Sequence, residues 1–334
     1  MTCRFKVLFF DRMHSAGTKL LQEKCDLVYL DSFGEESVIH RMKDVDAIII
    51  VRRGEVTRKI IESSPRLKVI GKHGVGVEKI DLLAAKEHGV SVVYTPTSNY
   101  QSVAEHFVTL ALMLAKRIKL GETSYQKGRW KNDPFEFLGM DLFGKTLGVM
   151  GFGRIGQQTA RICRRGFEMS ILYSDIVSYP EIEKELRARR VEKQLLFKES
   201  DFISINLPLI PQTQGLVNAE LIKLMKPTSF LLNMARGPIW NEKDVVRALA
   251  EKWISGVGTD VFESEPTSAD NPLFQFDSFV GTPHMGAHTE ESMMRSSLVA
   301  EDILAVLEGK APRFPVPAYF YPDSSHSQPL RKEV

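Results

Sequence analysis

Gly151-Phe152-Gly153-Arg154-Ile155-Gly156 follows directly on the apolar run Thr146-Leu147-Gly148-Val149-Met150 in this chain of 334 residues. An apolar run that leads into a glycine-rich turn predicts a strand, a tight turn and the start of a helix. The first glycine allows the turn, the second lets a ligand approach the backbone, and the third lets the helix pack closely on the strand. N–H groups at the start of such a helix favour an anion such as a pyrophosphate. The stretch therefore predicts a dinucleotide-binding α/β unit.

An acidic residue supports the same interpretation. Asp175 follows Gly156 at about 20 residues, just beyond a second apolar run at 169–173, and this is the usual spacing in such units. Its carboxylate can accept hydrogen bonds from the adenosine ribose and would repel a 2′-phosphate, and the next residue is Ile176 rather than an arginine. We therefore expect NAD(H) rather than NADP(H) as the cofactor. The alternative is a glycine-rich turn in another kind of doubly wound domain.

Composition favours a small-molecule enzyme over a nucleic-acid-binding protein. The chain has 44 basic and 42 acidic residues, a net charge of +2 and no long block of like charge. Its length suits two domains. The three cysteines, Cys3, Cys25 and Cys163, show no disulfide or metal-binding pattern, which fits a reducing compartment. Without a signal-peptide pattern or a membrane-spanning apolar run, the chain is expected to be cytoplasmic, with neither membrane nor nucleic-acid partners.

Strand-like and helix-like segments alternate along the first hundred residues. Strands are expected at 5–10, 26–30, 45–51, 69–71 and 90–94, and helices at 16–24, 56–63 and 82–87. Such alternation predicts a parallel sheet with helices on both faces. These residues therefore form one α/β domain of ordinary size.

A long apolar helix at 102–117 leads into the second domain. Because few of its residues after His106 are polar, it must be buried in the fold or in a subunit contact. Later strands are expected at 202–206, 229–233, 256–260 and 279–281, with a solvated charged helix within 181–190 and a helix at 290–308 that crosses back to the first domain. The predicted division is 1–101 with 290–316, then 102–289, then a flexible, Pro- and Ser-containing tail at 317–334.

Three charged side chains follow three strands of the second domain. Arg236, Glu265 and His284 come after the strands at 229–233, 256–260 and 279–281, and open α/β sheets bind ligands at the carboxyl ends of their strands. Taken singly, each is most simply a surface charge or a structural histidine. Together they supply a cation that polarises a ketone, an acid that protonates the forming alkoxide and a carboxylate that orients the acid. The set predicts hydride transfer to a 2-oxo acid.

Several motifs occur in an order that is typical of one family. They are HGVGVEKIDLLAA (73–85), SNYQSVAEH (98–106), GKTLGVMGFGRIG (144–156), NMARG (233–237), DVFESEP (260–266) and TPHMGAHT (282–289). From about 45 to 315 the chain resembles the D-isomer-specific 2-hydroxyacid dehydrogenases, most of all 3-phosphoglycerate dehydrogenases without a regulatory domain. The resemblance implies two doubly wound parallel-sheet domains, a Rossmann nucleotide-binding domain and a flavodoxin-like substrate-binding domain, with the active site in the cleft between them.

The resemblance also implies roles for individual residues. Arg236 binds substrate, His284 is the acid/base and Glu265 pairs with His284. The Val75-Gly76-Val77 loop is similar to one that binds the substrate carboxylate through N–H groups, and Asp260 is similar to a residue near the nicotinamide amide. Cofactor contacts are implied for Gly151, Gly153, Arg154, Ile155, Gly156, Asp175, Leu207, Pro208, Thr213, Met234, Ala235, Asp260 and Gly286.

Arg52, just after the strand at 45–51, bears on the choice of substrate. It is either an ordinary surface charge or a ligand of a second anionic group, and Lys72 and His73 could add positive potential. The resemblance makes 3-phosphoglycerate/phosphohydroxypyruvate the first expectation and hydroxypyruvate or glyoxylate reduction the alternative. A third interpretation, an NADH-responsive corepressor, is disfavoured by the complete catalytic set. The apolar helix at 102–117 and its flanks predict a homodimer.

Overall fold

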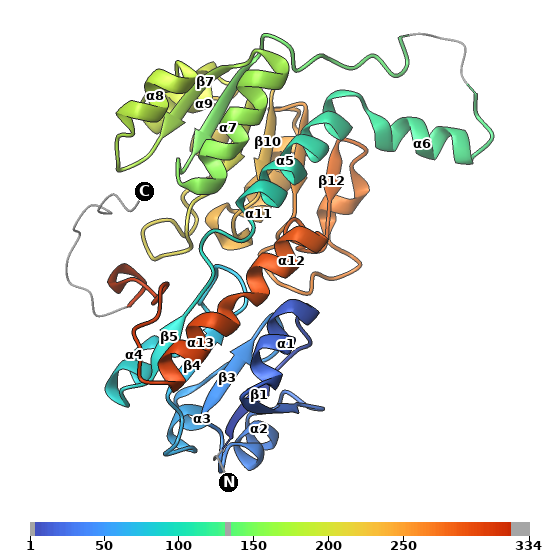
Figure 1. Ribbon diagram of the computed structural model, residues 1–334. Coiled ribbons are helices and arrows are strands. Elements are labelled where there is room, and N and C mark those ends of the chain that lie inside the picture. The colour runs from blue at the N-terminus through green and yellow to red at the C-terminus, as the bar shows by residue number, and fades with distance from the viewer. Residues whose placement is uncertain (1–3, 131–134, 322–334) are drawn as a thin grey trace. The chain divides into compact units, whose positions relative to one another are not determined.

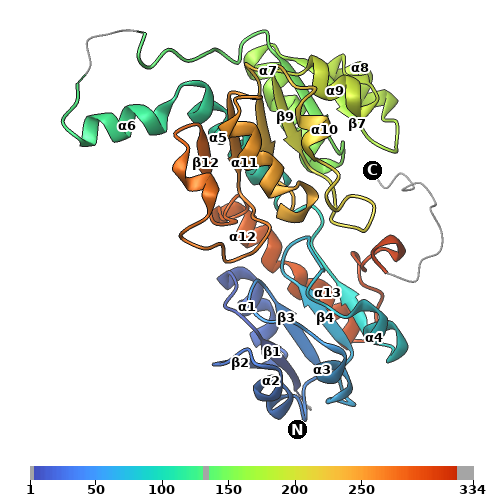
Figure 2. The same ribbon diagram turned by 180° about the vertical axis from the view of Figure 1, so that it is seen from behind.

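The computed structural model describes residues 4–130 and 135–321 (Figure 1). The chain forms two compact units, one made of Met1–Asn99 with His288–Val334 and the other of Tyr100–Ala287. Each unit contains a parallel sheet with helices packed against it (Figures 1 and 2), so the predicted fold class is confirmed. Within the described residues, no helix is both long enough and apolar enough to cross a membrane.

The first unit contains a five-stranded parallel sheet. Its strands are β1 (Phe5–Phe9), β2 (Cys25–Tyr29), β3 (Ala47–Ile50), β4 (Val69–Lys72) and β5 (Ser91–Val93). They lie in the order β2-β1-β3-β4-β5, which is the flavodoxin-like order. The helices are α1 (Ser15–Gln22), α2 (Glu35–Arg41), α3 (Arg58–Glu62), α4 (Leu82–Glu87), α12 (Glu290–Ser297) and α13 (Val299–Leu307).

Strand β3 shows why both faces of this sheet must be covered. All four of its residues are apolar and buried, and side chains along a strand alternate between the two faces. Ile48 and Ile50 lie in one apolar cluster, whereas Ala47 and Ile49 lie in another that includes Ile303 of α13. The segment at 290–307, distant in sequence, thus completes the core of the first unit.

The helix expected at 290–308 is two helices, so that prediction is wrong in this respect. Leu298 lies at the junction of α12 and α13. The hydroxyl of Ser297 donates to the carbonyl of Met294 at 2.7 Å and accepts the N–H of Gly17 at 3.1 Å. A serine that hydrogen-bonds to nearby backbone competes with a continuous helix. Both helices contact α1.

The second unit contains a seven-stranded parallel sheet. Its strands are β6 (Thr146–Met150), β7 (Ser170–Ser174), β8 (Arg189–Arg190), β9 (Phe202–Ile205), β10 (Phe230–Asn233), β11 (Gly256–Thr259) and β12 (Phe279–Gly281). The order is β12-β11-β10-β9-β6-β7-β8. It reverses next to β6, and ligands of doubly wound sheets bind outside the carboxyl ends of strands at such a reversal. The helices are α5 (Tyr100–Ala115), α6 (Ile118–Gln126), α7 (Arg154–Phe167), α8 (Pro180–Leu186), α9 (Lys193–Glu199), α10 (Ala219–Ile222) and α11 (Glu242–Ala250).

Helix α5 corresponds to the apolar helix expected at 102–117. Its residues Phe107, Leu110 and Leu114 are buried in a cluster with side chains of β6 and β10. The helix also packs along α7. Much of its apolar surface is therefore covered within the second unit.

The charged helix expected within 181–190 needs correction. Residues 181–190 do not form one helix, because α8 stops before Arg187, which has a left-handed φ of 51°, and Arg189–Arg190 pairs with β7 as strand β8. Within the tail predicted to be flexible from residue 317, Ala318–Phe320 form a 3₁₀ turn, and the ring of Phe320 lies 6.2 Å from that of Tyr94. The remainder of that tail, 322–334, lies outside the described residues.

Candidate active site

The turn between β6 and α7 has a geometry that requires its glycines. Gly151 has a φ of 90°, a left-handed conformation that glycine adopts readily, and a Cβ there would lie 2.8 Å from the carbonyl oxygen of Asn206. At Gly156 a Cβ would collide with the carbonyl of Gly151 and would lie 2.8 Å from Cγ1 of Val149. Helix α7 therefore begins close against the carboxyl end of β6.

The N-terminus of α7 fits the pyrophosphate of a dinucleotide. No side chain caps this helix, whose N-cap is Gly153, and a Cβ at Gly153 would meet no heavy atom within 4 Å. N–H groups of the first turn, among them those of Arg154 and Ile155, lack the intrahelical acceptors that later residues have. Open space beside these donors is suited to an anion.

Asp175 lies just after β7, beside the same turn. Its Oδ2 accepts the N–H of Phe152 at 2.6 Å and its Oδ1 accepts the N–H of Val177 at 2.9 Å. Each carboxylate oxygen has a further lone pair that can accept a ribose hydroxyl. Arg190 of β8 donates to the main-chain carbonyls of Asp175 and Ile176 at 2.8 and 3.2 Å. The sequence alone did not indicate that a guanidinium lies beside Asp175 and Ile176.

Further residues with predicted cofactor contacts follow β9 and β10. In the loop at 207–213, the hydroxyl of Thr213 donates to the carbonyl of Pro208 at 2.6 Å, which closes the loop on itself. Met234 and Ala235, directly after β10, are buried. They lie at the sheet edge where ligands of doubly wound folds bind.

Asn233, the last residue of β10, shapes the turn that carries Arg236. Its Oδ1 accepts the N–H of Ala235 at 3.0 Å, and its Nδ2 donates to the carbonyl of Arg236 at 3.0 Å. Gly237 then lies so close to the main chain of Phe262 that a Cβ would overlap it. The turn after β10 is thereby held against the turn after β11. Arg236 Nη1 donates to the carbonyl of Ala235 at 2.7 Å.

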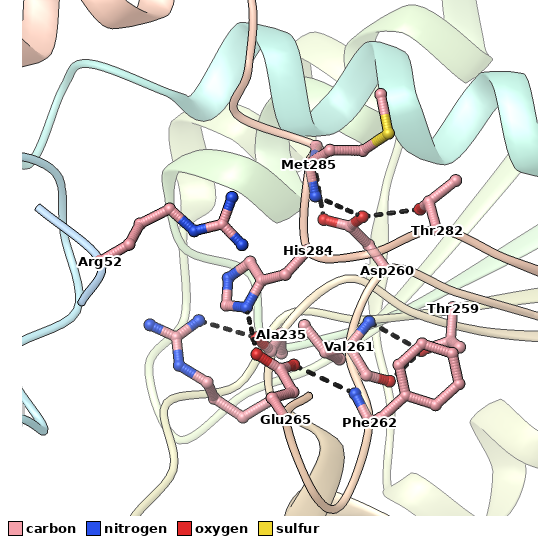
Figure 3. Close-up of polar contacts among 12 residues, drawn as sticks. Arg52, Ala235, Thr259, Asp260, Val261, Phe262, Glu265, Thr282, His284 and Met285 are labelled. Atoms are coloured by element: carbon pink, nitrogen blue, oxygen red, sulfur yellow. Dashed lines mark hydrogen bonds and ion pairs between the residues drawn. The ribbon is translucent and has the colours of Figure 1, made fainter. Parts of the chain in front are cut away.

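Figure 3 shows the carboxylate of Glu265 in contact with the imidazole of His284. Nδ1 and Oε2 lie 2.7 Å apart, and Oε1 accepts the N–H of Phe262 at 3.1 Å. Partial burial by itself raises the pKa of Glu265, but the bonds from His284 and the Phe262 N–H and the charge of Arg236 outweigh it, so the pKa is lowered. Glu265 is therefore ionised at neutral pH and must accept a proton that Nδ1 donates.

Asp260, buried after β11, fixes the turn that carries this imidazole. Its Oδ1 accepts the hydroxyl of Thr282 at 2.6 Å and the N–H of Met285 at 2.8 Å (Figure 3). Its Oδ2 accepts the N–H of Gly286 at 2.7 Å. Since Thr282 gives its only proton to the carboxylate, it must accept one from Nε2 of His106, 2.8 Å away. Burial lowers the pKa of His106 despite the nearby charge of Asp260. A neutral imidazole on α5 thus completes the network.

The first unit contains the predicted carboxylate-binding loop. Among the described residues, none accepts a hydrogen bond from the main-chain N–H groups of Val75, Gly76 and Val77. The loop is anchored just before them by Gly74, which has a φ of 117° and donates its N–H to Oγ1 of Thr95 at 2.9 Å. Three successive N–H groups are therefore available to an anion.

The side chain of Arg52 also belongs to the first unit. Its Nη1 lies 2.9 Å from Nε2 of His288. The next residue, Arg53, forms an ion pair with Asp11.

The expectation that His73 adds positive potential near this loop is wrong. Burial, together with the charge of Lys72, lowers the pKa of His73 to about 4. The imidazole is therefore neutral at pH 7. Lys72 donates to the carbonyl of Val51.

Sequence reasoning did not single out Asn233, His106 or His288 for these roles. Each lies within one of the motifs quoted above, so its place in a motif was a signal that could have marked it as functional. The roles depend on partners that the chain brings together only when folded, such as Thr282 for His106 and Arg52 for His288.

Comparison with known proteins agrees with this geometry. Residues 108–286 match the sequence model of the D-isomer specific 2-hydroxyacid dehydrogenase, NAD binding domain. The chain is 39% identical over 307 residues to D-3-phosphoglycerate dehydrogenase of Methanocaldococcus jannaschii, covering 91% of this chain but only 58% of that relative. It is 36% identical over 316 residues to glyoxylate reductase of Pyrococcus furiosus, covering 92% of this chain and 94% of the relative.

A solved structure extends the likeness to both units. The crystal structure of D-lactate dehydrogenase from Aquifex aeolicus, complexed with NAD and lactic acid, matches with a TM-score of 0.81 and 30% identity, over 91% of this chain and 96% of that one. The expectations of an oxidoreductase and of NAD as its cofactor are confirmed. The order of motifs, the two sheets and the similarity along most of the chain lead to one conclusion: this chain belongs to the D-isomer specific 2-hydroxyacid dehydrogenase family.

Proposed function

We propose that the protein interconverts a 2-oxo acid and its D-2-hydroxy acid with NAD(H), and that phosphohydroxypyruvate and 3-phosphoglycerate are its substrate pair. The 2.7 Å contact between Glu265 and His284 carries the proposal, together with the charge of Arg236 that acts on Glu265. Reduction of a 2-oxo acid needs this combination of an acid, an orienting carboxylate and a cation.

His284 moves the proton in this proposal. Because its Nδ1 is engaged by Glu265, Nε2 is the nitrogen that gives a proton to the substrate oxygen in reduction and takes it back in oxidation. Glu265 has a lowered pKa, so it stays ionised and stabilises the imidazolium rather than taking its proton. Bound NADH supplies the hydride that reduces the substrate carbon.

Arg236 and the loop of the first unit hold the substrate. A guanidinium has five N–H donors in a planar fork that matches a carboxylate, and the bond to Ala235 engages Nη1 of Arg236. We assign Arg236 to the substrate carboxylate and ketone oxygen. The N–H groups of Val75, Gly76 and Val77 provide further donors for the carboxylate.

Arg52 is assigned to the second anionic group, the phosphate of phosphohydroxypyruvate. The similarity to D-3-phosphoglycerate dehydrogenase of Methanocaldococcus jannaschii supports this substrate. Reduction of glyoxylate or hydroxypyruvate is the second candidate, and the match to glyoxylate reductase of Pyrococcus furiosus over 94% of its length favours it. The corepressor interpretation is set aside, because a binding protein has no need of the Glu265–His284 pair.

NADH oxidation with phosphohydroxypyruvate, hydroxypyruvate and glyoxylate tests the assignment. The largest kcat/KM is expected for phosphohydroxypyruvate, and Arg52→Ala should cost about 1.5–3 kcal/mol with it, the range for hydrogen bonds to charged groups. Glyoxylate has no side chain and should lose less. Equal losses would make Arg52 a structural residue, and absence of turnover of phosphohydroxypyruvate would leave the second candidate.

A homodimer is also proposed, formed by α5 and its flanks. Within the described part of 118–143, several large apolar side chains are 49% to 80% exposed, and in both views α6 extends away from the sheet of its own unit (Figures 1 and 2). Exposed apolar surface of this kind marks an interaction site. The residues are Ile118, Tyr125, Trp130, Phe135, Leu138 and Phe143.

A cytoplasmic location is proposed from the thiols. Cys25 and Cys163 are free and buried, and burial raises the pKa of Cys25 to about 11 and that of Cys163 to about 12. Reduced, unreactive thiols are typical of a reducing compartment. Cys3 lies outside the described residues.

A further inference from the structure

The bond between Arg52 and His288 can form in only one protonation state. A guanidinium has N–H donors and no acceptor, and it stays protonated in proteins. Since Nη1 of Arg52 lies 2.9 Å from Nε2 of His288, this ring nitrogen must be the acceptor. His288 is therefore neutral with its proton on Nδ1, and it orients the guanidinium without cancelling its charge.

Asp11 forms an ion pair with the neighbouring arginine, Arg53. Its Oδ2 accepts the N–H groups of Arg52 and Arg53 at 3.0 and 2.9 Å, and its Oδ1 accepts Nε of Arg53. Burial raises the pKa of Asp11, but these main-chain and side-chain donors outweigh it and lower the pKa. The ionised Asp11 thus balances the charge of Arg53 and fixes the main chain of Arg52 at the same time.

A third contact holds the main chain of Arg52. Nζ of Lys79 donates to its carbonyl at 2.8 Å. Asp11 and Lys79 therefore restrain the backbone of Arg52, while His288 restrains the far end of its side chain. Restraint at both ends removes much of the rotamer freedom that a long side chain otherwise loses on binding a ligand.

The position of His288 in the chain relates this contact to the catalytic turn. His288 follows His284 in the sequence Pro283-His284-Met285-Gly286-Ala287-His288. A covalent chain of this length keeps the Cα atoms of His284 and His288 within about 14 Å of each other. His288, which orients Arg52, is thus joined to the acid/base His284 by a short stretch of main chain.

We propose that His288 is a positioning residue that sets substrate specificity. It holds Arg52 as a pre-oriented cation for a second anionic group, such as a phosphate, on the side chain of the 2-oxo acid. The proposal rests on the substrate assignment made above and adds a residue to it. Loss of His288 should weaken recognition of the second anion more than turnover of a 2-oxo acid without one.

The test compares kcat/KM for phosphohydroxypyruvate with kcat/KM for glyoxylate in the full-length enzyme with NADH. His288→Phe keeps a ring but has no acceptor, so the ratio of the two values should fall about 3–10-fold, mainly through a higher KM for phosphohydroxypyruvate. His288→Gln offers a carbonyl acceptor and should restore most of the ratio. His40→Phe, at an exposed histidine of α2, is the matched control and should leave the ratio near that of the unmodified enzyme.

The outcomes distinguish failure of the role given to His288 from failure of the substrate assignment. If Arg52→Ala lowers the ratio and His288→Phe does not, the role of His288 is refuted while the substrate assignment stands. If neither variant changes the ratio, the substrate assignment falls as well. Should His288→Phe fail to fold by circular dichroism, His288→Leu carries the same expectation. A ratio that stays low in His288→Gln also contradicts the acceptor role.

Discussion

Nδ1 of His284 lies 2.7 Å from Oε2 of Glu265, and this contact determines which ring nitrogen can exchange a proton with a substrate. The other oxygen of Glu265 is held by the N–H of Phe262 at 3.1 Å, so the carboxylate is oriented by the main chain rather than by solvent. His284 has a left-handed φ of 54°, an uncommon conformation for a residue with a side chain. The turn around it is restrained by Asp260 through the N–H groups of Met285 and Gly286.

Glu265→Gln should move the alkaline limb of the pH profile for 2-oxo acid reduction to lower pH. Glu265 is ionised at neutral pH because its pKa is lowered, and an ionised partner favours the protonated ring. With the amide in its place, the ring gives up its proton more readily and activity declines earlier as pH rises. Steady-state kcat/KM across the neutral and alkaline range measures the shift. Glu263→Gln, at a nearby exposed carboxylate, should leave the profile in place, and an unchanged profile for Glu265→Gln would remove that residue from the mechanism.

Asp175→Ala should relax the preference for NADH over NADPH. The variant loses a carboxylate that repels a 2′-phosphate, while Arg190 remains beside the main chain of residues 175 and 176. Arg190→Ala is the opposite test and should lower efficiency with NADPH more than with NADH. Comparison of kcat/KM for the two cofactors measures both effects. Equal efficiencies in the unmodified protein would contradict the role given to Asp175.

Features that depend on local pattern could be predicted from the sequence. The glycine turn after the strand at 146–150 predicts a doubly wound sheet, because strand, turn and helix spacing are encoded within a few residues. Glu265 and His284 could be associated because both follow strands, and parallel strands end at one edge of a sheet.

Features that depend on distant partners could not be predicted. His106 and Thr282 are 176 residues apart in the chain, and Arg52 and His288 are 236 apart. No periodicity in the sequence relates such residues. Helices α2, α6, α9, α10 and α11 were also not predicted. At the break near Leu298, Ser297 also accepts a hydrogen bond from the N–H of the distant Gly17.

Light scattering at micromolar concentration should give about twice the 37.7 kDa mass of the chain. We expect a dimer because a second copy of the chain would cover the exposed apolar surface at 118–143. Phe143→Glu places a charge in that surface and should weaken the dimer. Ile176→Glu alters a residue that is 79% exposed but lies outside this segment, and it should leave the mass unchanged. A monomeric mass for the unmodified protein would refute the dimer.

His73 should make the protein less stable below neutral pH. Its pKa in the fold is about 4, lowered by burial first and then by the charge of Lys72, from an ordinary value of 6.5. The unfolded chain therefore binds a proton that the fold excludes, and the stability present above pH 6.5 decreases as pH falls toward 4. Between pH 7.5 and pH 5 this difference amounts to about 2 kcal/mol.

Urea unfolding at those two pH values measures the effect of His73. In His73→Gln the decrease in unfolding free energy between them should shrink by about that 2 kcal/mol. His40→Gln, at an exposed position, should keep the pH dependence of the unmodified protein. If His73→Gln had the same pH dependence as the unmodified protein, protonation of His73 would not be the cause of the loss of stability at low pH.

The proton-transfer role of His284 is tested most directly by kcat for NADH-dependent reduction of phosphohydroxypyruvate and glyoxylate in His284→Ala, with NADH binding measured on the same protein. We expect kcat to be lower by about 10²–10⁴, the range for a positioned acid/base. NADH binding should be largely retained, because the glycine turn and the N-terminus of α7 are intact. A variant that binds NADH and turns over either substrate at the rate of the unmodified protein would contradict the assignment of His284 as the acid/base.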